Sequence, residues 1–155
     1  MSTIPEARRT TEAQKQHSGI VRLLAILVMV GGAILSVGGA TTWGVVQTSL
    51  ADEKITVAED AARFAGQPVD GPLTAYAEAD IIKHHSLEAS QGKTYAELDR
   101  EDPVRTVVMN GSFLRASLFT SVVSFGVAAM ATGLGVLFFL VGFALLKITP
   151  KTAAE

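Results

Sequence analysis

Two stretches decide the fold: LLAILVMVGGAILSVGGATTWGVVQTSLA at residues 23–51 and ASLFTSVVSFGVAAMATGLGVLFFLVGFALL at residues 116–146. Neither contains an Asp, Glu, Lys or Arg, and each exceeds the roughly 20 apolar residues that a helix needs to cross a bilayer. The polar segment between them is too short to cover two such helices on every side. The sequence therefore predicts an all-α membrane protein whose two transmembrane helices, at 23–46 and 117–146, form a hairpin.

Composition excludes several classes of protein. The chain has 155 residues, a mean hydropathy of +0.35 and room for one domain at most. It contains no cysteine, which removes disulfides, thiol catalysis, zinc–thiolate sites and iron–sulfur ligation. A net charge of −2 gives no basic surface for nucleic acid. We expect no cofactor.

A cleaved signal peptide is the main alternative for the first apolar stretch. Basic residues precede it, and Ser49-Leu50-Ala51 has the small-x-small pattern of a cleavage site. The apolar stretch, however, is about twice as long as the 7–15 residues of a signal peptide's hydrophobic region. We favour an uncleaved anchor.

Orientation follows from basic residues near the ends of the spans. The tails carry six and the ends of the central segment four: Arg8, Arg9, Lys15, Arg22, Lys147 and Lys151 against Lys54, Arg63, Arg105 and Arg115. Residues 51–116 hold twelve acidic and seven basic side chains, a balance of −5. We predict a multi-pass plasma-membrane protein with a cytoplasmic basic tail at 1–22, an extracytoplasmic acidic helical segment at 47–116 and a cytoplasmic tail at 147–155.

Small residues recur at every fourth position of both spans. Because helices in lipid associate through close packing, such strips favour helix–helix contact. The candidate packing residues are Gly32, Ser36, Ala40 and Gly44 in the first span and Thr120, Ser124, Ala128 and Thr132 in the second. They predict contact between the two spans, with a second copy or with another membrane protein.

Helix signals divide the central segment. The capping box Thr56–Glu59 predicts a helix that ends at Gly66, and a second helix is expected from about Thr74 to Ser90. Another capping box, Thr94–Glu97, predicts a short helix to about Glu101.

Asp102-Pro103 is a strong helix start, with Asp as the N-cap and Pro at the first helical position. No strong break follows as far as Leu146, so the second span is expected to be the end of a 44-residue helix. Arg115 would then lie at the membrane surface, where its guanidinium can reach lipid headgroup phosphates.

Asp80, His84 and Glu88 form the one cluster that suggests chemistry. They are successive i, i+4 positions on a helix face and could hold a metal ion. His85 is turned about 100° from His84, so the two rings do not converge on one ion. A solvated or partner-facing polar surface is the favoured interpretation.

From about Thr56 to Leu146 the chain resembles a group of small actinobacterial two-span membrane proteins. The resemblance is carried by AARFAG at 61–66, HHSLE at 84–88, GKTYAEL at 92–98 and SFLRASLFTS at 112–121. Members often bear the label "aromatic ring-opening dioxygenase". Extradiol ring opening uses iron on two His and one carboxylate inside a shaped pocket. The adjacent His pair here does not fit that ligand geometry, so we treat the label as a mis-annotation.

The sequence favours a non-enzymatic accessory or scaffold subunit of a larger cell-envelope complex. Its expected partners are the lipid bilayer and another membrane protein or a second copy. The alternative is a metal-dependent enzyme at the membrane surface, of the labelled dioxygenase type, that uses His84 and Glu88. A sensor ranks last, because the cytoplasmic tails hold no output domain.

Overall fold

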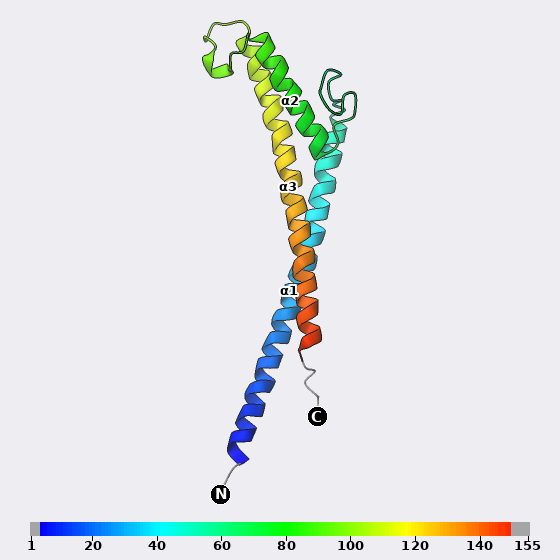
Figure 1. The fold of residues 1–155 in the computed structure, drawn as a ribbon, viewed down its shortest axis with the longest axis vertical. Coiled ribbons are helices and arrows are strands. Elements are labelled where there is room, and N and C mark those ends of the chain that lie inside the picture. The colour runs from blue at the N-terminus through cyan, green and yellow to red at the C-terminus, as the bar shows by residue number, and fades with distance from the viewer. Residues whose placement is uncertain (1–3, 150–155) are drawn as a thin grey trace. The chain divides into compact units, whose positions relative to one another are not determined.

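The computed structural model describes residues 4–149, with side chains described from residue 18 onward. Helix α1 runs over Ile4–Asp52, α2 over Pro72–Ala89 and α3 over Arg105–Ile148, with a short 3₁₀ helix, η1, at Tyr95–Glu97 (Figure 1). Within the described residues the fold is all-helical, and α1 and α3 are each long and apolar enough to cross a membrane. The predicted fold class is confirmed.

The chain divides into two compact units. One comprises the chain up to Gly39 and from Met130 onward, and the other comprises residues 40–129. The first unit thus holds parts of α1 and α3 only. The second holds the end of α1, all of α2 and the beginning of α3, together with the connecting loops.

In the first unit, glycines let the backbones of α1 and α3 approach closely. A Cβ built at Gly32 would lie 2.5 Å from the Phe139 nitrogen and 2.6 Å from the Gly135 oxygen. One built at Gly142 would lie 2.6 Å from the Ala25 oxygen. Gly142 contacts Ala25, whereas Gly135, earlier in α3, contacts Gly32, later in α1. The two helices therefore run antiparallel here.

The predicted packing residues divide by position. Gly32 contacts the facing helix, and the Ser36 hydroxyl donates to the Thr132 carbonyl at 3.4 Å. Buried Gly39, rather than exposed Ala40, continues this face. The buried positions of α1 in this unit, at 25, 32 and 39, are seven residues apart, which is the repeat of a left-handed helix pair and not a four-residue strip.

The remaining predicted packing residues lie in the second unit. Gly44 has open space at its Cβ position, and Thr120 is exposed, with its hydroxyl donating to the Ala116 carbonyl of its own helix. The Ser124 hydroxyl likewise donates to the Thr120 carbonyl. Ala128 is buried. Contact of these four-residue strips with a second copy or with another membrane protein stays a prediction.

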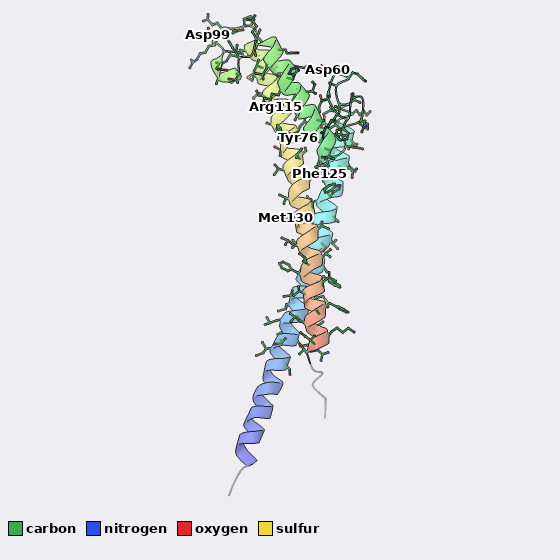
Figure 2. The ribbon with its side chains drawn as sticks, in the orientation of Figure 1. Asp60, Tyr76, Asp99, Arg115, Phe125 and Met130 are labelled. Atoms are coloured by element: carbon green, nitrogen blue, oxygen red, sulfur yellow. The ribbon has the colours of Figure 1, made fainter. Side chains whose placement is uncertain are left out.

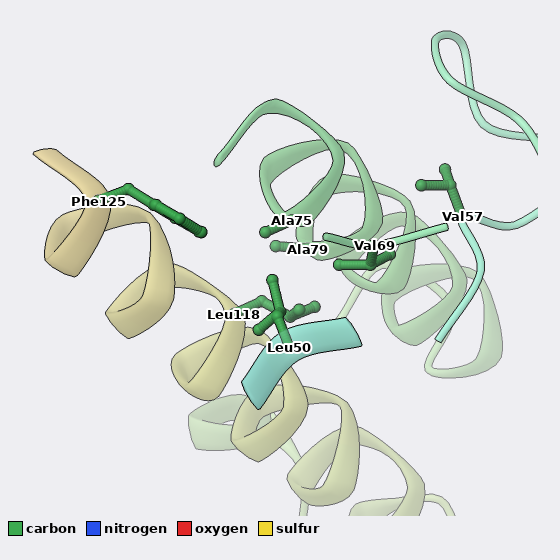
Figure 3. Close-up of a cluster of buried hydrophobic side chains, with 7 residues drawn as sticks. All are labelled: Leu50, Val57, Val69, Ala75, Ala79, Leu118 and Phe125. Carbon is green, nitrogen blue, oxygen red and sulfur yellow. The ribbon is translucent and has the colours of Figure 1, made fainter. Parts of the chain in front are cut away.

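The second unit has a hydrophobic core where all its elements meet (Figure 3). Its buried members are Leu50, Val57, Val69, Ala75, Ala79, Leu118 and Phe125. Trp43 packs edge-on against Phe125, with ring centroids 4.7 Å apart. Because the core takes residues from α1, the loop, α2 and α3, it holds the loop at 53–71 onto the helices.

Helix α2 confirms the predicted second helix and begins two residues earlier, with Pro72 in its first turn. Its end is closed by two hydrogen bonds, from the Gly92 nitrogen to the Leu87 oxygen at 2.7 Å and from the Gln91 nitrogen to the Glu88 oxygen at 3.2 Å. Gln91, the first residue after the C-cap, has a φ of 56°, the left-handed conformation that this type of helix end requires.

Helix α3 confirms the predicted long helix and begins two residues after Pro103. The Asp102 carboxylate accepts from the Val104 nitrogen at 2.9 Å, as an N-cap does. The helix predicted from Thr94 to Glu101 is shorter than expected and covers only Tyr95–Glu97. Its capping contact is present, since the Glu97 carboxylate accepts from the Thr94 nitrogen at 2.8 Å.

The helix predicted from Thr56 to Gly66 is wrong. Residues 53–71 form an irregular loop closed by hydrogen bonds between its two arms, including the Val57 nitrogen to the Gln67 oxygen and the Gly66 nitrogen to the Val57 oxygen, both at 2.9 Å. Phe64 and Gly66 have φ of 62° and 69°, which a helix cannot accommodate. Burial of Val57 and Val69 in the core outweighs the local capping signal.

Candidate functional site

An open cleft of about 690 Å³ lies in the second unit, between the loop at 60–64 and one face of α2. Apolar and charged side chains both line it. They are Asp60, Ala61, Ala62, Arg63, Phe64, Leu73, Tyr76, Ala77, Asp80, Ile81, Lys83, His84 and Leu87. Figure 2 labels two of them, Asp60 of the loop and Tyr76 of α2.

Two polar contacts fasten the loop to α2 and so fix the width of the cleft. The Asp60 Oδ2 lies 2.7 Å from the His85 Nε2. The Ala58 nitrogen donates to the Glu78 carboxylate at 2.9 Å. This second contact satisfies the Ala58 N–H, which would have had no partner within the first turn of the predicted helix.

The Asp60–His85 pair shifts the titration of both groups. The hydrogen bond from His85 lowers the pKa of Asp60 below its ordinary value of 3.8. The same hydrogen bond raises the pKa of His85 above its ordinary value of 6.5. The charged forms of both groups therefore coexist across mildly acidic pH, where the loop is held most firmly.

Three charged side chains of the cleft have no ion-pair partner within the described part of the chain. Arg63 comes from the loop, and Asp80 and Lys83 come from α2. Charged groups that line a hollow without an internal partner are available to a ligand. Arg63 and Lys83 could not be predicted as binding residues from the sequence, because their place beside one hollow depends on how the loop folds back.

The sequence-predicted metal candidates do not converge. His84 Nε2 lies 3.1 Å from Glu88 Oε1, and both side chains are well exposed. Asp80 lies in the wall of the cleft. Among the described residues no three His, Asp or Glu side chains are close enough together to hold a metal ion. The His85 ring instead contacts Asp60 of the loop.

Arg115, predicted to contact lipid headgroups, packs against α2. Its Nε donates to the Ala79 carbonyl at 3.2 Å, and its guanidinium lies 5.8 Å from the Phe119 ring centroid. This contact joins α2 to α3 directly before the charge-free stretch of α3 begins. Headgroup binding by Arg115 stays a prediction.

A second, smaller hollow of about 330 Å³ lies between α2 and the first turns of α3. It is lined by Ile82, His85, Ser86, Val107, Asn110, Gly111 and Leu114. Gly111 lets α3 approach α2 closely at this hollow, because a Cβ there would collide with Ser86 of α2. Val107 and Leu114 are 55% and 54% exposed, although they are apolar and precede the charge-free stretch.

No family model, curated protein or solved structure matches this chain.

Proposed function

We propose that this chain is a non-enzymatic two-pass membrane protein that serves as an accessory or scaffold subunit of a larger cell-envelope complex. In this proposal α1 and α3 anchor it in the plasma membrane, both chain ends are cytoplasmic, and residues 53–104 lie outside. The bias of basic residues toward the tails supports this orientation.

The exposure of the long helices supports the membrane location. Only 11% of the most apolar stretch of each helix is buried within the described protein. A core helix of a soluble protein would be covered by the rest of its domain. These side chains are instead exposed on the surface of the chain, as lipid contact requires.

One observation carries the proposed scaffold role. Val107 and Leu114, one heptad apart on α3, expose an apolar surface beside Ile82, outside the charge-free stretch where lipid would cover it. Exposed apolar patches on a part of the protein that faces water are typical of interaction sites. We infer that an apolar helix face from another membrane protein occupies the smaller hollow.

Affinity purification of the full chain from its native membranes in mild detergent tests this proposal. We expect a stoichiometric companion protein with the wild type. The double variant Val107→Glu and Leu114→Glu should lose it, because two carboxylates would be buried in the contact. Ser112→Glu, an exposed position on another face of α3, should keep it. Recovery of the wild-type chain alone would contradict the proposal.

A further inference from the structure

The larger cleft changes in character along its length. At one end lie Leu73 and Tyr76, which are 66% and 53% exposed in the first turn of α2. The Tyr76 ring lies 5.8 Å from that of Phe119 on α3. Phe119 is the fourth residue of the charge-free stretch that begins at Ala116. The apolar end of the cleft is therefore level with the outer edge of the second span.

From that edge the cleft runs outward. Helix α2 rises antiparallel to α3, since Ala79 meets Arg115 and Ser86 meets Gly111. From Leu73 to Leu87 the cleft follows α2 for about 21 Å at 1.5 Å per residue. It thus joins the level of the apolar stretch to the charged exterior, and a molecule that enters from the bilayer can reach the charged groups.

The charges at the outer part have both signs. Arg63 and Lys83 supply hydrogen-bond donors to an anion, and Asp80 supplies an acceptor for a cation. Asp60 is already engaged by His85. A ligand that matches this set carries a negative and a positive group close together and an apolar tail.

We propose that the cleft binds a zwitterionic aminophospholipid taken from the bilayer, a diacyl phosphoethanolamine. Its phosphate contacts Arg63 and Lys83, its ammonium contacts Asp80, and the start of one acyl chain lies on Leu73 and Tyr76. This inference rests on the membrane location that we propose above. The cleft volume of about 690 Å³ suits a headgroup with part of a chain.

Other lipids match the lining less well. An anionic phosphatidylglycerol places a phosphate near Asp80 and gives that carboxylate no cation. A phosphatidylcholine carries a quaternary ammonium that has no N–H to donate to Asp80. A diacylglycerol leaves Arg63 and Lys83 without an anion. The headgroup preference therefore reports directly on the proposed contacts.

Native mass spectrometry of the full chain, with an equimolar mixture of phosphatidylethanolamine, phosphatidylglycerol and phosphatidylcholine in mixed micelles, tests the proposal. The lipids carry acyl chains of different mass. We expect one tightly held phosphatidylethanolamine, preferred about tenfold over the other two, because a charge-assisted hydrogen bond distinguishes them. Diacylglycerol and inorganic phosphate serve as competitors and should displace little of it.

Variants separate the two charged contacts. Asp80→Asn should abolish the preference for phosphatidylethanolamine over phosphatidylglycerol, and Arg63→Gln with Lys83→Gln should lower retention of both about tenfold. Asp99→Asn and Lys93→Gln, at exposed positions away from the cleft, are the matched controls and should bind as the wild type does. Far-UV circular dichroism checks that each variant folds, and if the double variant does not, Asp80→Asn decides alone.

Three results would overturn the proposal: no headgroup preference in the wild type, an unchanged preference in Asp80→Asn, or equal displacement by diacylglycerol. A fourth result, release of a bound peptide in place of lipid, would overturn the proposal as well. Carbonate extraction distinguishes this failure from failure of the proposed function. A chain that stays in washed membranes with its companion but shows no preference contradicts the lipid site only, whereas a chain that leaves the membranes contradicts the membrane role.

Discussion

Asp60 and His85 form the contact that most directly controls the cleft, because they join its two walls. The folded-state pKa of His85 is raised, so its contribution is fully present below the unfolded value of 6.5 and is lost as pH rises through the folded value. The folded-state pKa of Asp60 is lowered, so its contribution is present above 3.8 and is lost as pH falls through the folded value.

We therefore expect the loop at 53–71 to be most strongly protected between about pH 4 and pH 6.5. Hydrogen exchange of the Val57, Gly66 and Val69 amides, corrected for intrinsic rates, measures this. The maximum of protection in this pH range should disappear in Asp60→Asn and should persist in Asp99→Asn. Protection that is independent of pH in the wild type would show that the pair does not hold the loop.

His84 and Glu88 bear on the alternative of a metal-dependent enzyme. They contact each other at 3.1 Å and bring no third His, Asp or Glu into reach in the described structure. Two ligands on an exposed helix face bind transition metals weakly, because structural and catalytic sites use three or four. We expect the purified chain to retain less than one metal ion per ten molecules by elemental analysis, as a rough bound. Stoichiometric metal that is lost in His84→Ala would reverse this conclusion.

At the scale of the elements, close approach of α1 and α3 in the first unit depends on glycine. A leucine at Gly135 or Gly142 would collide with the facing backbone, which cannot move as the tip of a side chain can. Over-packing of this kind costs typically 1–3 kcal/mol, and more where backbone is the obstacle. We expect either substitution to lower the melting temperature in detergent by several degrees.

Gly133→Leu is the matched control, since nothing lies within 4 Å of a Cβ at that position of the same helix. Its melting temperature should change little. If Gly133→Leu and Gly135→Leu destabilise the protein equally, the observed effect reflects a general need for small residues in the helix and not this contact.

The elements also show which features could be predicted from sequence. The charge-free stretches determine α1 and α3, and Gly92 and Asp102 mark helix boundaries within about two residues, because these signals are local. The loop at 53–71 could not be predicted in the same way. Its Thr56–Glu59 capping box is a sound local signal, but Val57 is buried by the core and the Ala58 nitrogen is taken by Glu78, twenty residues away.

The cleft could not be predicted from the sequence for the same reason. Asp80 and His84 could be placed on one face of α2 from their spacing alone. Arg63, Phe64 and Asp60 reach that face only because the loop folds back, and no periodicity reports this. The small-residue strip of α1 shows a related difficulty, because the four-residue strip and the seven-residue repeat of buried positions share position 32 and then diverge at positions 39 and 40.

At the scale of the whole molecule, different parts of the chain have different proposed tasks. The charge-free stretches of α1 and α3 would serve as anchors, and Gly32, Gly135 and Gly142 serve the packing of the two helices. The polar part of the second unit holds the two hollows and, among the residues that the structure describes, the three groups with shifted pKa values, Asp60, His85 and Glu97. The proposed binding functions therefore require that this part lie outside the bilayer, on one side of it.

The absence of cysteine makes that requirement directly measurable, because any single cysteine is the only thiol in the chain. Asp99→Cys, Arg22→Cys and Lys147→Cys are treated in intact cells with a membrane-impermeant maleimide. We predict that Asp99→Cys is labelled at once and that the other two are labelled only after the membrane is permeabilised. Labelling of all three in intact cells, or of Arg22→Cys and Lys147→Cys on opposite sides, would contradict the two-span hairpin.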